Sequence, residues 1–439
     1  MSRPSSPYIN FLLDSVPSMT ALSATIPPTP LRIERRALRV AMLAPPWIAV
    51  PPLGYGGIEA VVALLSDDLV ARGHHVTLFA APGSISAAEM HATLARSHAD
   101  QIGSSLHESD HVGAAYDAID QAGADGQPFD VIHDHSGFTA VAMAARVSVP
   151  VVHTLHAPFN DETRPFYTRH GHKAHLVAIS RYQLAHAPPG VHVADIVPNP
   201  IRVEDWPLRE HKDDYVLWMG RMDAAKGAHR AIVAARLAGM RLVLAGPVQP
   251  GQEKYFQSEI EPHVDNRDVV YVGEVGGARH KELFAHAKAF LMPIRWPEPF
   301  GMVMVEALAC GTPVITFPEG AASEIVIDGE NGFHVPDEQA MADAVGLLET
   351  IDPLRCRESV ASRYDAAIVA DGYEAVYRDV IQATGSRTGR FARPGRAQYR
   401  RDVQADLNLA IRRPTTLQHT GRRMDASAIL RNVGNDPLG

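Results

Sequence analysis

Cysteine is scarce in this chain, and long hydrophobic runs are missing. The 439 residues include 2 cysteines, Cys310 and Cys356, which are too few for a disulfide framework and favour a reducing compartment. No stretch approaches the roughly 18 apolar residues that a membrane-spanning helix needs. The sequence therefore predicts neither a signal peptide nor a membrane span, and we expect a cytoplasmic protein.

Two common nucleotide-binding motifs are also missing. No Gly-x-x-x-x-Gly-Lys-Ser/Thr loop occurs, and in the run Gly54-Tyr55-Gly56-Gly57 two glycines are adjacent, unlike the Gly-x-Gly-x-x-Gly pattern of dinucleotide sites. P-loop hydrolysis and nicotinamide chemistry therefore both lose support.

Positive charge is in short supply overall. Against 50 acidic residues there are 41 basic ones, a formal net charge of -9, so nothing in the total charge favours nucleic-acid binding. Basic residues gather at the C-terminal end, where arginine outnumbers aspartate and little periodicity is present. We expect residues 386–439 to be a disordered tail, and the Ser/Pro/Thr-rich residues 1–37 to be a disordered leader.

Between these ends, short apolar runs alternate with longer amphipathic segments, which is typical of parallel strands buried on both faces with helices between them. The length suggests two domains. We expect an α/β fold of two doubly wound Rossmann-like domains, residues 38–200 and 201–360, with 361–385 as a helix returning to the first. The expected strands are Leu38–Leu43, Val76–Ala80, Val131–His135, Val149–Leu155, Leu176–Ile179, Asp195–Val197, Tyr215–Met219, Leu242–Ala245, Val269–Val272, Ala289–Met292, Val314–Thr316 and Gly332–Val335.

Gly56 and Gly57 open a segment whose apolar residues have helical spacing. A loop without side chains at a helix N-terminus lets a phosphate reach free N–H groups. The glycines could equally serve only a tight turn.

Two cations follow the expected strand Tyr215–Met219. Arg221 and Lys226 lie in Gly-Arg-x-x-x-x-Lys-Gly, at the carboxyl end of a strand, where a bound diphosphate would lie. Arginine can fork onto two phosphate oxygens and lysine adds a point charge. An ordinary surface pair is the alternative interpretation.

The most informative stretch runs from Pro297 to Ile315. Pro299 suits the first turn of a helix, Glu298 precedes that turn, and Glu306 would lie about two turns in. One carboxylate can then meet a sugar and the other a ribose diol. The alternatives are a helix-dipole partner for Glu298 and a solvated face for Glu306.

Together with the Gly-Gly-Ile-Glu turn and Asp328-Gly-Glu-Asn-Gly-Phe333, these motifs resemble retaining glycosyltransferases of family four, which have the GT-B fold. The resemblance runs from about Leu38 to Gln382. It implies that the diphosphate is held by Arg221 and Lys226, and the ribose by Glu306. For the transferred sugar it implies Glu298, His156 and the backbone of Phe300, Gly301 and Met302. For the donor phosphate it implies Gly56 and Gly57.

His133-Asp134-His135 has the look of a metal site. On a strand the two histidines face one way and the aspartate the other, which opposes shared coordination, so we expect a structural role or an acceptor-lining one. No Asp-x-Asp occurs, which agrees with cations and helix termini neutralising the diphosphate. We therefore predict no metal and no cofactor.

These features predict a metal-independent retaining enzyme that moves a hexose-type sugar from a nucleoside diphosphate to a hydroxylated acceptor. A UDP-sugar is favoured over GDP- and ADP-sugars, and neither nucleic acid nor membrane is an expected partner. Alternatives are a nucleotide-sugar hydrolase or epimerase, a glucan phosphorylase-like enzyme of the same fold, and a non-catalytic sugar-nucleotide binding protein.

Overall fold

The computed structural model describes residues 36–54 and 56–387. Almost all of the expected leader and tail, and Tyr55, therefore lie outside the described residues. Every described helix and strand lies in the unit that begins at Leu38. None of these helices is long and apolar enough to cross a membrane.

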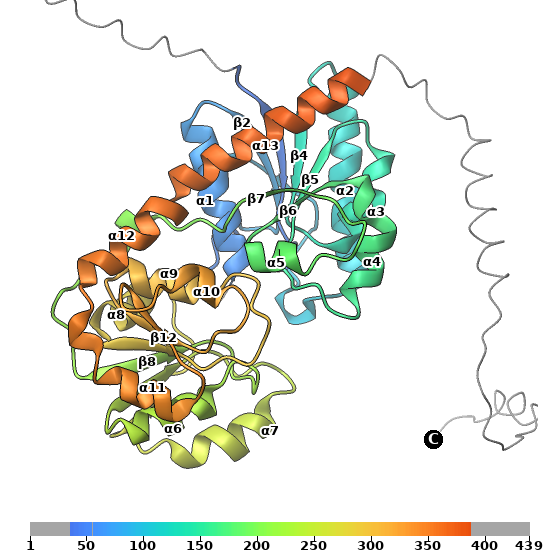
Figure 1. The fold of residues 1–439 in the computed structure, drawn as a ribbon. Helices are drawn as coiled ribbons and strands as arrows, with labels where there is room; N and C mark the ends of the chain where they lie inside the picture. The colour runs from blue at the N-terminus through green and yellow to red at the C-terminus, as the bar shows by residue number, and fades with distance from the viewer. Residues whose placement is uncertain (1–35, 55, 388–439) are drawn as a thin grey trace, which may run out of the picture. The chain divides into compact units, whose positions relative to one another are not determined.

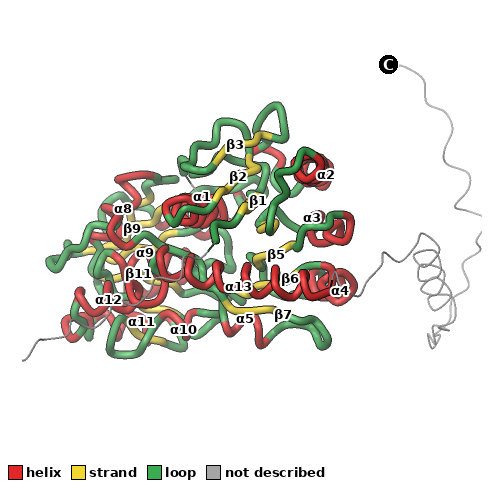
Figure 2. Tube along the Cα trace, turned by 90° about the horizontal axis from the view of Figure 1, so that it is seen from above, coloured by secondary structure: helices red, strands yellow, loops and turns green. Residues whose placement is uncertain are grey.

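The first sheet has seven parallel strands in the order β3-β2-β1-β4-β5-β6-β7. Figure 2 shows β3, β2, β1, β5, β6 and β7 following one another in this order. The strands are β1 (Arg39–Leu43), β2 (His75–Ala80), β3 (Glu89–Ala92), β4 (Val131–Asp134), β5 (Val151–Thr154), β6 (His175–Ala178) and β7 (Val193–Ile196). The helices among them are α1 (Gly57–Ala71), α2 (Ser105–Ala124), α3 (Phe138–Met143), α4 (Thr163–His170) and α5 (Arg181–Ala185).

The second sheet has six parallel strands in the order β10-β9-β8-β11-β12-β13. They are β8 (Tyr215–Met219), β9 (Arg241–Ala245), β10 (Val269–Tyr271), β11 (Ala289–Met292), β12 (Val314–Thr316) and β13 (Gly332–His334). The helices are α6 (Ala228–Leu237), α7 (Glu253–Tyr255), α8 (Gly277–His286), α9 (Met302–Ala309), α10 (Ala322–Ile325), α11 (Glu338–Val345), α12 (Pro353–Tyr364) and α13 (Ala366–Arg387). The predicted α/β class with two parallel sheets is confirmed.

Both faces of each sheet are buried, as the unbroken apolar runs require. In β1, Val40 and Met42 join one hydrophobic cluster while Ala41 and Leu43 join another. Successive side chains of a strand point to opposite faces, so a central strand such as β1 contributes to two cores. This arrangement leaves the strand ends as the places where polar chemistry can gather.

The sequence did not predict strand β3. β3 reads Glu-Met-His-Ala, and all four residues are exposed. It pairs only with β2, at the edge of the sheet. An edge strand that buries no side chain carries no apolar run, which is why the pattern missed it.

The last helix of the described chain packs on the first sheet. Tyr373 and Tyr377 of α13 are buried in the same cluster as β1, β2 and α1. Arg72, which follows α1, donates hydrogen bonds to Asp371 and to the carbonyl of Ala367. Figure 1 shows α13 running beside α1. Helices α12 and α13 are separate, because the chain leaves helical geometry at Asp365.

Each sheet has one point where the strand order reverses. In the first it lies between β1 and β4, and in the second between β8 and β11. Loops at the carboxyl ends of such strands diverge and leave a crevice that binds ligands. The loops after β1, β4, β8 and β11 are thus the places to search for a site.

Candidate active site

The loops after β8 and β11 touch through their backbones. Arg295 N–H donates to the carbonyl of Ala225 at 2.9 Å. Gly227 has φ +83°, and a Cβ there would lie 2.2 Å from the carbonyl oxygen of Pro293. Only glycine combines this backbone conformation with so close an approach. The glycine of the Lys-Gly motif therefore sets the distance between the two loops.

Lys226 and Glu298 meet at this reversal point. The Lys226 ammonium forms a salt bridge with the Glu298 carboxylate, and the two side chains are 21% and 14% exposed. Lys226 Nζ also lies 5.9 Å from the centre of the Trp296 ring. Two residues that the sequence assigned to the diphosphate and to the sugar are thus partners of each other.

The helix that follows Glu298 starts later than the sequence suggested. Gly301 is its N-cap with φ +98°, and α9 begins at Met302, so Pro299 is not in the first turn. Two backbone hydrogen bonds hold the loop: Ala321 N–H donates to Glu298 O, and Glu298 N–H donates to Trp296 O. No described residue accepts a hydrogen bond from the N–H of Phe300, Gly301 or Met302. These donors are available to a ligand.

Glu306 has a partner that the sequence did not reveal. It is the fifth residue of α9, just over one turn in instead of two. Its Oε2 lies 3.0 Å from Nε2 of His280 on α8. Burial lowers the pKa of His280, but the Glu306 carboxylate outweighs this and raises it overall. The charged form of His280 is therefore stabilised by Glu306, and the contact orients the Glu306 carboxylate.

Arg221 lies in the same loop as Lys226 but reaches another one. Its Nη1 donates to Gln249 Oε1 at 3.3 Å, in the segment after β9. Its Nε is buried and has no hydrogen-bond partner among the described residues. No described contact joins Arg221 or Glu306 to the Lys226–Glu298 pair. An anion at this loop would satisfy the unpaired Nε.

The first sheet presents a glycine-led helix at its own reversal point. Gly56 is the N-cap and Gly57 the first residue of α1, a helix of 15 residues. A Cβ at Gly57 would meet no atom within 4 Å, so the space beside Gly57 is open, whereas a Cβ at Gly56 would lie 2.7 Å from Ile48 and Pro52. Glu59, in the first turn, is buried, and burial raises its pKa to about 7. The sequence analysis did not single out this carboxylate.

His156 follows β5 and is paired with another histidine. Its Nε2 lies 2.8 Å from Nδ1 of His135, and the two rings are stacked. Burial lowers the pKa of both, so both stay neutral near pH 7. One imidazole must donate to the other, which fixes the tautomer and orientation of His156.

In the segment His133-Asp134-His135, the side chains of His133 and Asp134 point to opposite faces of the sheet, as strand geometry predicted. His133 bonds Tyr377 of α13 and Thr154, while Asp134 bonds His153 and Ser136. The opposite orientation of Asp134 is thus confirmed. Within the described part of the chain, no group of three or more His, Cys, Asp or Glu is arranged to hold a metal ion.

Comparisons with known proteins show the family of the chain. The model of the glycosyl transferases group 1 matches residues 203–362, and that of Glycosyltransferase Family 4 matches residues 55–205. The chain belongs to the GT-B glycosyltransferases. A phosphatidyl-myo-inositol mannosyltransferase of Mycobacterium leprae is 27% identical over 80% of this chain and 99% of its own.

Solved structures show the same fold for this glycosyltransferase. AviGT4, a glycosyltransferase involved in avilamycin A biosynthesis, matches with a TM-score of 0.60 and 27% identity, over 79% of this chain and 98% of its own. Sucrose-phosphate synthase from Thermosynechococcus elongatus matches with a TM-score of 0.66 and 20% identity, over 79% and 100%. The similarity to sucrose-phosphate synthase, at 20% identity, shows a shared fold alone.

Two cavities are lined by segments that follow strands of the first sheet together with loops and helices that accompany the second. A small one, about 20 Å³, is lined by Pro158 and Phe159 from the segment after His156 and by Pro297 and Pro299 from either side of Glu298. The segments that carry His156 and Glu298 therefore approach each other, which no sequence motif could show.

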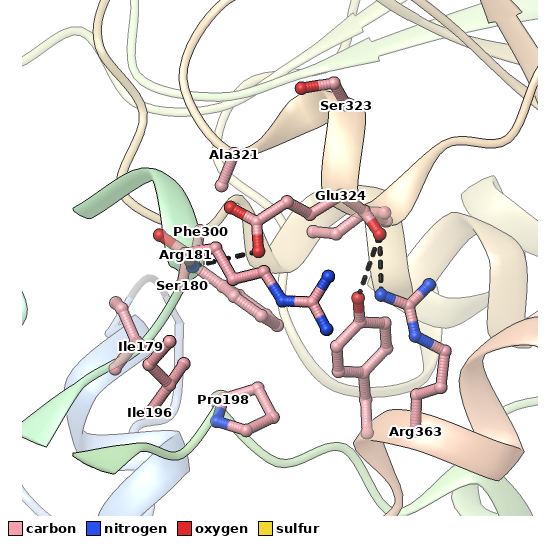
Figure 3. Close-up of a pocket in the computed structure, with 12 residues that line it drawn as sticks. Ile179, Ser180, Arg181, Ile196, Pro198, Phe300, Ala321, Ser323, Glu324 and Arg363 are labelled. Atoms are coloured by element: carbon pink, nitrogen blue, oxygen red, sulfur yellow. Dashed lines mark hydrogen bonds between the residues drawn. The ribbon is translucent and has the colours of Figure 1, made fainter. Parts of the chain in front are cut away.

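The larger cavity has a volume of about 350 Å³ (Figure 3). Phe300, from the loop between β11 and α9 that carries Glu298, lies in its wall, together with residues that the sequence analysis did not single out. Its lining comprises Ile179, Ser180, Arg181, Ile196, Pro198, Phe300, Ala321, Ser323, Glu324, Ile325, Arg363 and Tyr364.

Proposed function

We propose that this glycosyltransferase transfers a hexose from a UDP-sugar to an acceptor hydroxyl, with retention of the anomeric configuration and without a metal ion. The observation that carries the proposal is the Lys226–Glu298 pair at the reversal point of the second sheet. It puts a cation for the leaving diphosphate and a carboxylate for the sugar in contact. Arg221, with its unpaired Nε, supplies a second cation.

Donor binding exchanges partners in this proposal. Lys226 leaves Glu298 for the diphosphate, and Glu298 accepts hydrogen bonds from sugar hydroxyls. Glu306, oriented by His280, accepts from the ribose diol. The free N–H groups at the start of α9 face the donor, and the open N-terminus of α1 offers further stabilisation to phosphate.

The reaction then proceeds on one face of the sugar. The bond from the anomeric carbon to the diphosphate oxygen breaks, and its electron pair leaves with the diphosphate. The acceptor oxygen forms the new bond on the same face and passes its proton to a departing phosphate oxygen. Stabilisation of the leaving group by Arg221 and Lys226 is the main catalytic contribution, and neutral His156 positions the sugar.

The mycobacterial relative is named for mannose transfer, so mannose and glucose are the first donor sugars to test. Both cysteines are free and buried, in keeping with the cytoplasmic location that we propose.

Product analysis tests the reaction. The protein is incubated with UDP-glucose or UDP-mannose and an acceptor panel in EDTA, and the anomeric proton of the product is followed by NMR. We expect an α-linked product and undiminished turnover. A β-linked product would exclude retention, and loss of turnover on chelation would exclude metal independence. Free sugar formed equally without acceptor would support the hydrolase alternative.

A further inference from the structure

The larger cavity has a positive charge that the described residues leave unbalanced. Three charged side chains line it: Arg181, Arg363 and Glu324. The Glu324 carboxylate is already bound, because the backbone N–H groups of Arg181 and Tyr182 donate to it at 2.9 and 2.6 Å. It forms no salt bridge with either arginine.

Both guanidinium groups keep free donors. No described residue accepts a hydrogen bond from the Arg181 side chain, and Figure 3 shows its guanidinium group reaching into the space between Glu324 and Pro198. Arg363 Nη2 donates a hydrogen bond to the carbonyl of Glu324 at 2.6 Å, and the guanidinium group lies over the ring of Tyr364. Two like charges that share a cavity repel each other, so an anion between them would be stabilised.

The geometry favours phosphate among possible anions. A carboxylate presents two oxygens in one plane, which suits a single arginine fork, whereas a phosphate offers oxygens in several directions to donors from different elements. Arg181 begins α5 and Arg363 lies in the last turn of α12, so they approach from separate elements. The volume of about 350 Å³ is within the range of small-molecule pockets.

The cavity also borders the loop between β11 and α9 that carries Glu298. Phe300 lines it directly, and Ala321, another lining residue, donates its N–H to the carbonyl of Glu298 at 2.8 Å. A ligand whose phosphate lies at the arginines would therefore extend toward the place where the sugar is transferred. Ser323 adds a hydroxyl group to the wall, and Ser180 Oγ, which already accepts from the Gln183 N–H, can still donate to a polyol.

We propose that Arg181 and Arg363 bind the phosphate of a phosphorylated polyol acceptor. This inference rests on the proposed function for its role in transfer, whereas phosphate binding in the cavity does not depend on it. A free polyol phosphate and a lipid headgroup share this chemistry.

Binding is tested with inorganic phosphate. The full chain is first given excess UDP to occupy the diphosphate site, and phosphate is then titrated calorimetrically. We expect Arg181→Met and Arg363→Met each to weaken phosphate binding at least tenfold. Arg355→Met is the matched control: it lies on the same helix as Arg363, pairs with Glu358 at the surface and should change nothing. Arg181→Met keeps the backbone bond to Glu324, so it should fold normally.

Transfer is tested with glucose 6-phosphate against glucose, and glycerol 1-phosphate against glycerol. We expect the phosphorylated member to be preferred in the wild type and the preference to be lost in Arg181→Met. The binding is repeated with vesicles of phosphatidic acid in phosphatidylcholine. Arginine-dependent binding to the vesicles alone would support the site and identify a lipid acceptor.

The outcomes separate the two proposals. If phosphate binding and acceptor preference are the same in wild type, Arg181→Met and Arg363→Met, the cavity proposal is overturned while sugar transfer stands. If phosphate binding depends on Arg181 but no sugar is transferred from any donor, the cavity stands as a phosphate site and the proposed function falls.

Discussion

Replacing Lys226 with alanine is expected to lower kcat/KM by about 10² to 10³-fold. The ammonium group is the cation in contact with Glu298, and in the proposed mechanism it moves to the diphosphate as negative charge develops. Its loss removes stabilisation of the leaving group and leaves the partly buried Glu298 carboxylate without its partner. Steady-state kinetics with saturating acceptor measure the effect.

Lys254→Ala is the matched control, because Lys254 is an exposed lysine of the same domain, on α7. Glu298→Gln should lower activity in the wild type but add little in the Lys226→Ala background, since residues in contact are not additive. Near-normal turnover of folded Lys226→Ala would rule out this residue as the counter-charge of the diphosphate.

Replacing Gly320 with alanine should have a large effect although it changes no charged group. Gly320 has φ +61°, and its Cβ would lie 2.3 Å from the carbonyl oxygen and 2.4 Å from the nitrogen of Glu298. The backbone that positions Glu298 must move. Because a displacement of about 1 Å can cost a hundredfold in rate, we expect a loss of that order in kcat and a lower melting temperature.

Gly329→Ala separates backbone strain from steric overlap. Gly329 has a similar φ of +73°, but a Cβ there would meet nothing within 4 Å. This control should show only the strain of a left-handed residue, about 1 to 2 kcal/mol in the free energy of unfolding, with activity retained. Equal activity losses in the two variants would contradict a specific role for Gly320 in placing Glu298.

The two sheets were predictable because their strands are buried on both faces. Such strands must be continuous apolar runs, so the segments around Leu43, Met219 and Met292 are visible in the sequence. The exact ends of the strands were harder to predict than their existence. The fifth strand begins at Val151 and not at Val149, since Pro150 cannot donate a ladder hydrogen bond.

The site was predictable only in part. Lys226 and Glu298 lie in motifs at strand ends, and topology brings strand ends together. The partner of Glu306 was hidden, because the contact with His280 depends on how α8 packs beside α9. Arg181 and Arg363 were hidden for the same reason: they are far apart in the chain and belong to no motif. Pairing between elements is decided by packing, which one sequence does not display.

The salt bridge between Lys226 and Glu298 changes how the family resemblance is interpreted. The resemblance implies two separate roles for these residues, and the structure joins them in one ion pair, so in the proposed mechanism Lys226 exchanges Glu298 for the diphosphate. Separating a partly buried ion pair leaves two charges without partners, which costs free energy. The donor must therefore supply a new partner to both Lys226 and Glu298.

A crystal structure of the protein with UDP bound tests the central claim most directly. The account predicts the diphosphate beside Arg221 and Lys226, with the Lys226–Glu298 salt bridge broken and the ribose hydroxyls on Glu306. A diphosphate bound elsewhere, with that salt bridge intact, would contradict it.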